Sequence, residues 1–185
     1  MYLELNEEQK LIQDTARKFA QVELEPVAAR LDQAGDQDAF LGNLKKLANL
    51  GFMGINIKED YGGAQAGMVA FSVAITEIAR ACASTAVTVS VNNLVCDVIQ
   101  AVGSEVQKKA YIPKICSGEF VAGSFALTEP GAGSDPAAMT TSAILDGSEW
   151  VLNGTKRFIT SAPYAGVFVV WVHSFCSQAR NVAQF

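Results

Sequence analysis

The chain has 185 residues, of which half are hydrophobic and 18% are charged. This composition supplies enough apolar material for a sizeable core and excludes a disordered acidic or basic tail. The net charge of −5 at pH 7 argues against a nucleic-acid-binding protein, which usually carries a basic stripe. The length predicts one domain or two small ones.

Neither a targeting segment nor a membrane anchor is expected. The N-terminus lacks a basic region followed by an apolar run, so it does not resemble a secretory signal. The apolar stretch at residues 83–95 is interrupted by Asn92 and Asn93 and is interpreted as too short to span a membrane. The four cysteines contain no Cys-x-x-Cys pair, and His173 is the single histidine, so no metal site is predicted. Reduced, mostly buried cysteines in a cytosol-like compartment are the expectation.

The first half of the chain has helical patterns. Asn6 and Gln9 suit a capping box, and apolar residues follow at helical spacing until Pro26, which is expected to kink or divide the helix. A second helix is predicted from Phe40 to Leu50, with Gly51 as its stop. A third is predicted around residues 70–78.

The fourth predicted helix has the most regular apolar stripe, and Gly103 is expected to end it. Its members are Val87, Val91, Leu94, Val95, Val98 and Val102. Ser104 and Gln107 offer a capping box for a fifth helix, which Pro113 is expected to interrupt. Stripes of this kind are more typical of a helix-bundle core than of cofactor contacts.

The pattern changes near residue 119, where we place a domain boundary between residues 1–119 and 120–185. Strands are predicted at residues 120–127, 139–145, 150–155 and 167–172, with a turn at Asp146 and Gly147. The sequence therefore predicts an α+β chain, helices first and strands second.

The glycine-rich loop at residues 128–135, TEPGAGSD, is the most informative segment. Glycines allow a ligand to approach the backbone closely, and exposed amides can bind an anion. An ordinary tight connection explains the loop equally well when it is taken alone. It is neither a P-loop nor a Rossmann fingerprint.

Combination with neighbouring segments makes the loop specific. FALTEPGAGSD (residues 125–135) is followed by WVLNGTK (150–156) and FIT (158–160), and SEVQKKAYIPK (104–114) and YGG (61–63) precede it. This set closely resembles the acyl-CoA dehydrogenase family, over about residues 3–171.

The resemblance implies an all-α N-terminal domain, a β-barrel middle domain and a C-terminal helical bundle. It also implies the cofactor FAD and an acyl-CoA substrate, which is dehydrogenated between its α and β carbons to the trans-2-enoyl-CoA. A carboxylate would take the α proton while the β hydrogen leaves as hydride to FAD.

The resemblance also implies individual residue roles. Thr128 would hydrogen-bond the pyrimidine end of the flavin, Ser134 would contact the acyl-CoA, and Thr160 would donate to the flavin nitrogen that receives the hydride. The implied cofactor-binding residues are Phe125, Ala126, Leu127, Thr128, Glu129, Pro130, Gly131, Ala132, Gly133, Ser134, Phe158, Ile159 and Thr160.

Three departures from the family pattern follow from the sequence. Phe158 stands where the family usually has tryptophan, and the resemblance is expected to fade after Trp171. The bundle that supplies the catalytic glutamate is expected to be absent, so no catalytic residue is assigned and Glu129 is not a candidate base. A truncated or frame-shifted reading frame is the favoured explanation, and His173, Cys176 and Arg180 receive no role.

Two functional hypotheses of different classes remain. One is a piece of an acyl-CoA dehydrogenase, with an acyl-CoA oxidase as a neighbouring possibility. The other is a non-catalytic binding or assembly module that keeps only the helical domain. For the complete enzyme the resemblance implies electron-transfer flavoprotein as acceptor, a homotetramer or homodimer, and a cytoplasmic or mitochondrial-matrix location.

Overall fold

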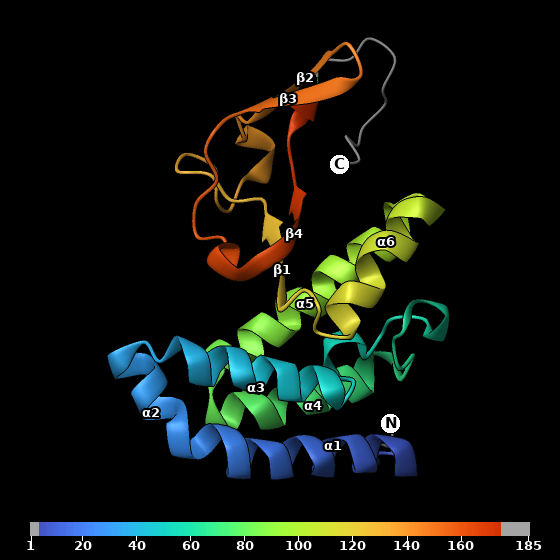
Figure 1. Ribbon diagram of the computed structural model, residues 1–185, viewed down its shortest axis with the longest axis vertical. Coiled ribbons are helices and arrows are strands. Elements are labelled where there is room, and N and C mark those ends of the chain that lie inside the picture. The colour runs from blue at the N-terminus through green and yellow to red at the C-terminus, as the bar shows by residue number, and fades with distance from the viewer. Residues whose placement is uncertain (1–3, 175–185) are drawn as a thin grey trace.

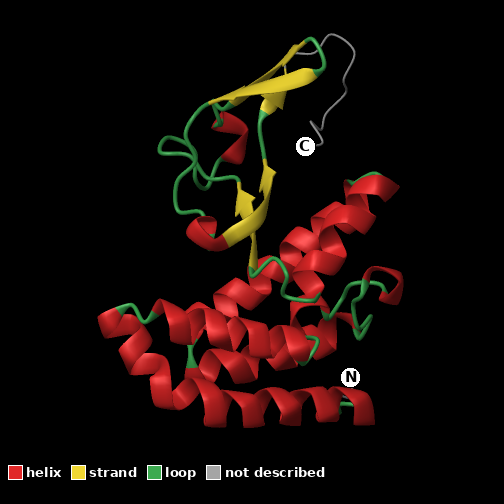
Figure 2. Ribbon diagram, in the orientation of Figure 1, coloured by secondary structure: helices red, strands yellow, loops and turns green. Residues whose placement is uncertain are grey.

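The computed structural model describes residues 4–174 of the chain. Within these residues six α-helices come first; α1 to α4 lie in the lower part of Figure 1, α6 rises to the height of β1 and β4, and the β2–β3 hairpin lies at the top (Figures 1 and 2). The helices are α1 (Glu7–Phe19), α2 (Glu25–Ala34), α3 (Gln37–Asn49), α4 (Gly67–Ala81), α5 (Ala83–Val102) and α6 (Glu105–Cys116). The strands are β1 (Ala122–Ala126), β2 (Ser142–Asp146), β3 (Glu149–Asn153), β4 (Ala165–Val170) and β5 (His173–Ser174). The predicted α+β class is confirmed.

Local signals set the start of α1 and its separation from α2. The Asn6 side chain accepts from the Gln9 amide at 2.8 Å, and Gln9 Oε1 accepts from the Asn6 amide at 3.1 Å, which completes the predicted capping box. Residues Ala20–Leu24 form a π-helical turn, and Pro26 lies in the first turn of α2. Proline is tolerated there because amides of the first turn have no partner within the helix. The division predicted at Pro26 is therefore confirmed.

The centre of the helical part is a cluster of large aliphatic side chains. Leu44 and Leu47 of α3 and Ile78 of α4 are fully buried, together with Leu24 and Met53. Their spacing is the one that the sequence predicts for the second and third helices, because each helix turns one apolar stripe inward. Leu50 is 46% exposed, at the point where α3 ends and Gly51 adopts φ +80°.

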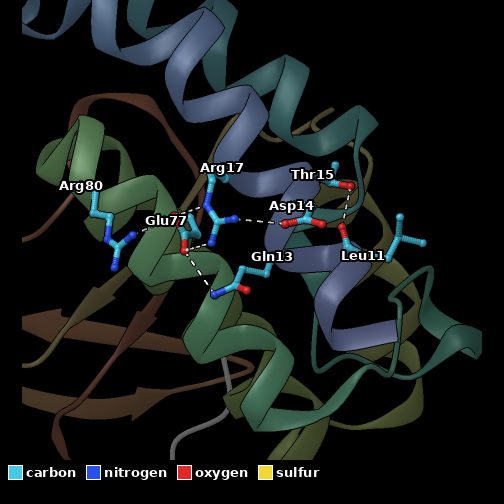
Figure 3. Close-up of polar contacts among 7 residues, drawn as sticks. All are labelled: Leu11, Gln13, Asp14, Thr15, Arg17, Glu77 and Arg80. Carbon is cyan, nitrogen blue, oxygen red and sulfur yellow. Dashed lines mark hydrogen bonds and ion pairs between the residues drawn. The ribbon is translucent and has the colours of Figure 1, made fainter. Parts of the chain in front are cut away.

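A buried carboxylate joins α1 to α4 (Figure 3). Glu77 on α4 is 2% exposed and accepts from Arg17 Nη2 at 2.9 Å and Nε at 3.2 Å. Gln13 Nε2 donates to it at 3.2 Å and Arg80 Nη1 at 3.4 Å. The hydrogen bond from Arg17 holds the pKa of Glu77 below its usual range. This network compensates the burial of the charge.

The prediction that the apolar stripe forms the buried face of α5 is wrong. Of its members only Val95 is buried, whereas Val87, Leu94 and Val102 are 49%, 42% and 44% exposed. Asn92 and Asn93 occupy the buried face instead.

Backbone hydrogen bonds explain why amides replace valines there. Asn93 Oδ1 accepts from the Ile55 amide at 2.8 Å, and its Nδ2 donates to the Phe52 carbonyl at 2.9 Å. Asn92 Oδ1 accepts from the Gly123 amide at 2.9 Å. The two amides thus satisfy buried backbone groups, which valine side chains could not do.

Helix α5 is longer than the apolar stretch at residues 83–95. The helix has 20 residues with a mean hydropathy of 1.3 over its most apolar 18-residue window, so by length and composition it is long and apolar enough to cross a membrane. The length argument made from the sequence is therefore wrong. Half of the apolar window is buried inside the molecule, where α5 contacts α4, α6 and β1, and this packing accounts for the composition.

Pro113 does not interrupt α6, contrary to the prediction. The helix starts at the predicted Ser104–Gln107 capping box and continues through Pro113 to Cys116. Ile112, Ile115 and Cys116 are buried. Proline in the last turn removes one helical hydrogen bond, and burial of the apolar side chains around it holds the helix together.

The strands form two small sheets. β1 pairs with β4 in parallel, with Ser124 opposite Phe168. β2 and β3 form an antiparallel hairpin, and β5 adds to β2 in parallel. The hairpin turns at Asp146 and Gly147, as predicted, with Gly147 at φ +63°. β1 leads into the glycine-rich loop, and β3 leads into the segment that ends at Thr160.

Candidate functional site

The structure brings together two segments that lie about 25 residues apart in the sequence. The first segment is residues 125–135 and the second is residues 150–160. The Arg157 amide donates to the Thr128 carbonyl at 2.8 Å, and Lys156 Nζ donates to the Leu127 carbonyl at 2.9 Å. In addition, Ser124 Oγ donates to the Thr160 carbonyl at 2.7 Å. The segments that the sequence singles out therefore form one site.

Glu129 is the most enclosed polar residue of the first segment. It is 5% exposed, and Lys156 Nζ lies 2.9 Å from its Oε1. The amides of Thr140 and Thr141 donate to it at 2.6 and 2.9 Å, and both threonine hydroxyls also donate. The Thr141 hydroxyl, Lys156 and Thr140 hold the pKa of Glu129 far below its usual range. A carboxylate held ionised by five donors is a weak base.

The tip of the first segment is open. Glu129 and Ala132 exchange two backbone hydrogen bonds, of 3.0 and 3.2 Å, which fold the chain around Pro130 and Gly131. A Cβ on Gly131 or on Gly133 would meet no atom of the described residues within 4 Å. The packing of the chain therefore does not require glycine at these positions, and space beside the backbone is free for a ligand.

The second segment ends in a strained stretch. Phe158 and Ser161 have φ values of +58° and +62°, which non-glycine residues rarely adopt. The Phe158 ring is 79% exposed, and the Arg157 guanidinium lies 4.6 Å from the ring centre. The strain thus presents an aromatic ring on the surface beside the first segment.

Three hydroxyls of the site have no partner within residues 4–174. These are the side chains of Thr128 and Thr160, both half-buried, and of Ser134, which is exposed. Each hydroxyl can donate one hydrogen bond and accept others. The site therefore offers unused donors next to open space.

A cleft of about 460 Å³ lies beside Thr160, between the helical part and the second segment. From the helical part it is lined by Phe40, Ala83, Ser84, Val87 and Thr88, and from the strand part by Thr160, Ser161, Pro163 and Tyr164. The hydroxyls of Thr88 and Ser161 lie 3.3 Å apart across it. The helical residues of this cleft were not predicted from the sequence. Their only signal is helical periodicity, and the exposed Val87 belongs to the stripe that it assigned to the core.

Among the described residues, the side chains of the histidine and of the cysteines form no hydrogen bond with the two segments. His173 is exposed on β5, and Cys82, Cys96 and Cys116 are buried free thiols. Cys176 and Arg180, to which the sequence assigns no role, lie outside the described residues.

Comparison with known families covers both parts of the chain. Residues 6–119 match the acyl-CoA dehydrogenase N-terminal domain, and residues 124–184 match the middle domain of the same family. The chain belongs to the acyl-CoA dehydrogenase family. The middle-domain match extends past Trp171, where the sequence analysis placed the end of the resemblance.

Individual relatives support the same assignment. The chain is 40% identical over 173 residues to the acryloyl-CoA reductase (NADH) of Anaerotignum propionicum, covering 92% of this chain and 43% of that protein. It is 42% identical over 170 residues to the mitochondrial short-chain specific acyl-CoA dehydrogenase of Homo sapiens, covering 91% of this chain and 40% of that protein. The relatives thus include bacterial and mitochondrial proteins, and the chain spans less than half of their length.

A solved structure of the family has the same fold. The acyl-CoA dehydrogenase of Bacillus anthracis, complexed with FAD, superposes with a TM-score of 0.84 at 33% sequence identity. The superposition covers 92% of this chain and 29% of that one.

Proposed function

We propose that this chain contributes the flavin-facing half of an FAD-dependent acyl-CoA dehydrogenase. The observation that carries the proposal is the joining of residues 125–135 to residues 150–160, with the Thr128 and Thr160 hydroxyls left without a partner among residues 4–174. The acyl-CoA dehydrogenase relatives and the FAD-complexed structural neighbour support the choice of cofactor.

The residues present fit this cofactor. Open space beside Gly131 and Gly133 allows close approach of a flat or anionic group, and the exposed Phe158 ring offers an apolar surface for stacking. FAD would supply the acceptor for the hydride that leaves the β carbon. The Thr160 hydroxyl would donate toward the flavin nitrogen that receives it, where a donor stabilises developing negative charge. Thr128 would donate to the pyrimidine end of the ring.

Substrate contact is assigned to Ser134, whose exposed hydroxyl would bind the acyl-CoA. Glu129 is not proposed as the α-proton base, since its five donors lower its pKa and make it a weak base. For the complete enzyme we propose electron-transfer flavoprotein as acceptor, a homodimeric or homotetrameric assembly, and a cytoplasmic or mitochondrial-matrix location.

The experiment that tests the cofactor site replaces Thr160 by valine in the complete flavoprotein. The change keeps the shape of the side chain and removes one hydroxyl donor, which costs about 0.5–1.5 kcal/mol of binding free energy. FAD dissociation, followed by flavin fluorescence, should be faster, and the visible flavin spectrum should shift. Thr155→Val, at an exposed position of the same segment, is the matched control. An unchanged spectrum with unchanged FAD affinity would contradict the role of Thr160.

The reverse reaction is a second candidate, because one relative of 40% identity is named acryloyl-CoA reductase. The same site would then deliver hydrogen to an enoyl-CoA. Anaerobic mixing distinguishes the directions. Acyl-CoA that bleaches the oxidised flavin supports dehydrogenation, and enoyl-CoA that reoxidises the reduced flavin faster than acyl-CoA bleaches it supports reduction. The 185 residues alone are expected to bleach no flavin, because none of their glutamates matches the catalytic glutamate that the family resemblance places in the C-terminal bundle.

A further inference from the structure

Lys156 binds the first segment on both sides of Thr128. Its Nζ donates to the Leu127 carbonyl and to Glu129 Oε1, each at 2.9 Å. The next residue, Arg157, donates its amide to the carbonyl of Thr128 itself at 2.8 Å. Two consecutive residues of the second segment therefore hold three consecutive residues of the first.

The ion pair between Lys156 and Glu129 is buried. The side chains of Lys156 and Glu129 are 10% and 3% exposed. Burying two charges costs desolvation energy that their attraction often fails to exceed, so such a pair is weak evidence for stability alone. The pair instead fixes the position of the two segments relative to each other, because the charged groups of Lys156 and Glu129 must stay within hydrogen-bond distance.

Neighbouring contacts leave the pair little freedom. Both oxygens of Glu129 are also occupied by Thr140 and Thr141. At the end of β3, a Cβ on Gly154 would lie 2.4 Å from Thr141 Oγ1, so the backbone passes directly against this threonine on its way to Lys156. The pair thus sits where three stretches of chain converge.

We propose that Glu129 and Lys156 form a positioning pair that orients the Thr128 hydroxyl and, through Arg157, the exposed ring of Phe158 toward the flavin. The inference rests on the proposed function and gives Glu129, which the family resemblance places among the cofactor-binding residues, a positioning role that it shares with Lys156. Loss of either partner loosens the two segments relative to each other, and the helical part stays folded because the hydrogen bonds of the pair go to Leu127, Thr140 and Thr141, which lie outside the helices.

The test uses Glu129→Gln and Lys156→Met, which keep the side-chain shapes and remove one charge each, in the complete flavoprotein. Lys156→Arg retains the charge and serves as the conservative variant. Glu119→Gln is the matched control, because Glu119 forms an exposed ion pair with Lys114 at 3.2 Å. FAD affinity, the visible circular dichroism of the bound flavin and the thermal unfolding of the helices are measured for each.

Each neutral variant should bind FAD about tenfold more weakly or worse, as expected when hydrogen bonds to a charged group are lost. The flavin dichroism should change, Lys156→Arg should recover part of the affinity, and Glu119→Gln should match the parent. The double variant should lose no more than the worse single variant, because both remove the same interaction.

The outcomes separate the two proposals. A parent protein that binds no FAD overturns the proposed function, and the positioning role with it. A parent that binds FAD, with folded variants of equal affinity and unchanged flavin dichroism, overturns the positioning role alone. If Glu129→Gln fails to fold, the Lys156→Arg variant is used instead. Loss of helical structure in Lys156→Arg as well would show that the pair stabilises the fold and would refute the inference.

Discussion

Large aliphatic side chains fill the interior of the helical part, whereas the buried hydrophobic residues of the strand part, as far as it is described, are alanines. Leu24, Leu44, Leu47 and Ile78 are at most 1% exposed in the first part, while the second buries Ala122, Ala126, Ala132 and Ala143. In β1 and β4, Phe125, Val167 and Val169 are half-buried and pack against buried residues of α5 and α6, whereas Phe168 is 41% exposed.

This difference shows how a site can be fixed where little apolar area is available. The helical part is stabilised by burial, which is strong but non-directional. The strand part relies on directed contacts, namely the Asn92 amide at its root and the buried Glu129–Lys156 pair in the site. The segments proposed to face FAD therefore belong to the part whose geometry depends on hydrogen bonds and charge.

The sharpest contrast is expected from Leu47→Ala. Removing a fully buried leucine from α3 should lower the free energy of unfolding by about 2–5 kcal/mol, because a cavity remains. Urea denaturation followed by helical circular dichroism measures it. Leu11→Ala is the matched control, since Leu11 is 68% exposed on α1 and should cost less than about 0.5 kcal/mol. Equal losses for both would remove the proposed basis of helical stability.

A smaller loss is expected from Glu77→Gln. The change removes a charge that Arg17, Gln13 and Arg80 bind, and hydrogen bonds to charged groups contribute about 1.5–3 kcal/mol. Arg17 is 41% exposed and also pairs with Asp14, so water can solvate it after the change. Glu7→Gln, at an exposed pair with Lys10, should have little effect.

The same carboxylate predicts a pH dependence. The pKa of Glu77 is lower in the folded chain than in the unfolded one, chiefly because of the hydrogen bond from Arg17. Its stabilisation is therefore complete above the unfolded value of about 4.3 and is lost as the pH falls through the folded value. Parent and Glu77→Gln should converge in stability under acid. A constant difference down to the lowest pH at which the chain folds would contradict this.

Asn92→Ala should affect the connection between the two parts. It leaves the Gly123 amide at the start of β1 without its acceptor, which costs about 1–3 kcal/mol. Hydrogen exchange of β1 and β4 should accelerate more than that of α3. Asn93→Ala is the comparison, because Asn93 binds backbone groups at residues 52 and 55 within the helical part. Equal acceleration of the strands by both variants would refute a specific role for Asn92.

The smallest effect is expected from Ile144→Thr on the β2–β3 hairpin. Ile144 is 53% exposed, and threonine keeps the β-branched shape that strands favour, so the loss should stay below about 0.5 kcal/mol. The hairpin should also exchange its amides faster than α5, since few of its side chains are buried. Slower amide exchange in the hairpin than in α5 would contradict the expectation that the helical part is the more stable of the two parts.

Local chemistry in the sequence determined much of this molecule. The capping boxes at Asn6 and Ser104, the division at Pro26 and the turn at Gly147 all involve residues that are close in sequence, so their physics is visible in a short window. The two segments ending at Asp135 and Thr160 were also predicted, together with the family that carries them.

Tertiary structure alone decided which face of α5 is buried and what holds the site. The sequence of α5 alone does not show whether its valines or its asparagines are buried. That is decided by the backbone groups of residues 52–55 and 123, which hydrogen-bond the asparagine side chains in the folded chain. The Glu129–Lys156 pair and the cleft beside Thr160 likewise join residues far apart in the sequence. Burial and pairing depend on contacts with residues that are distant in the sequence. Apolar periodicity reports only the residues of one helix, so it cannot predict those contacts.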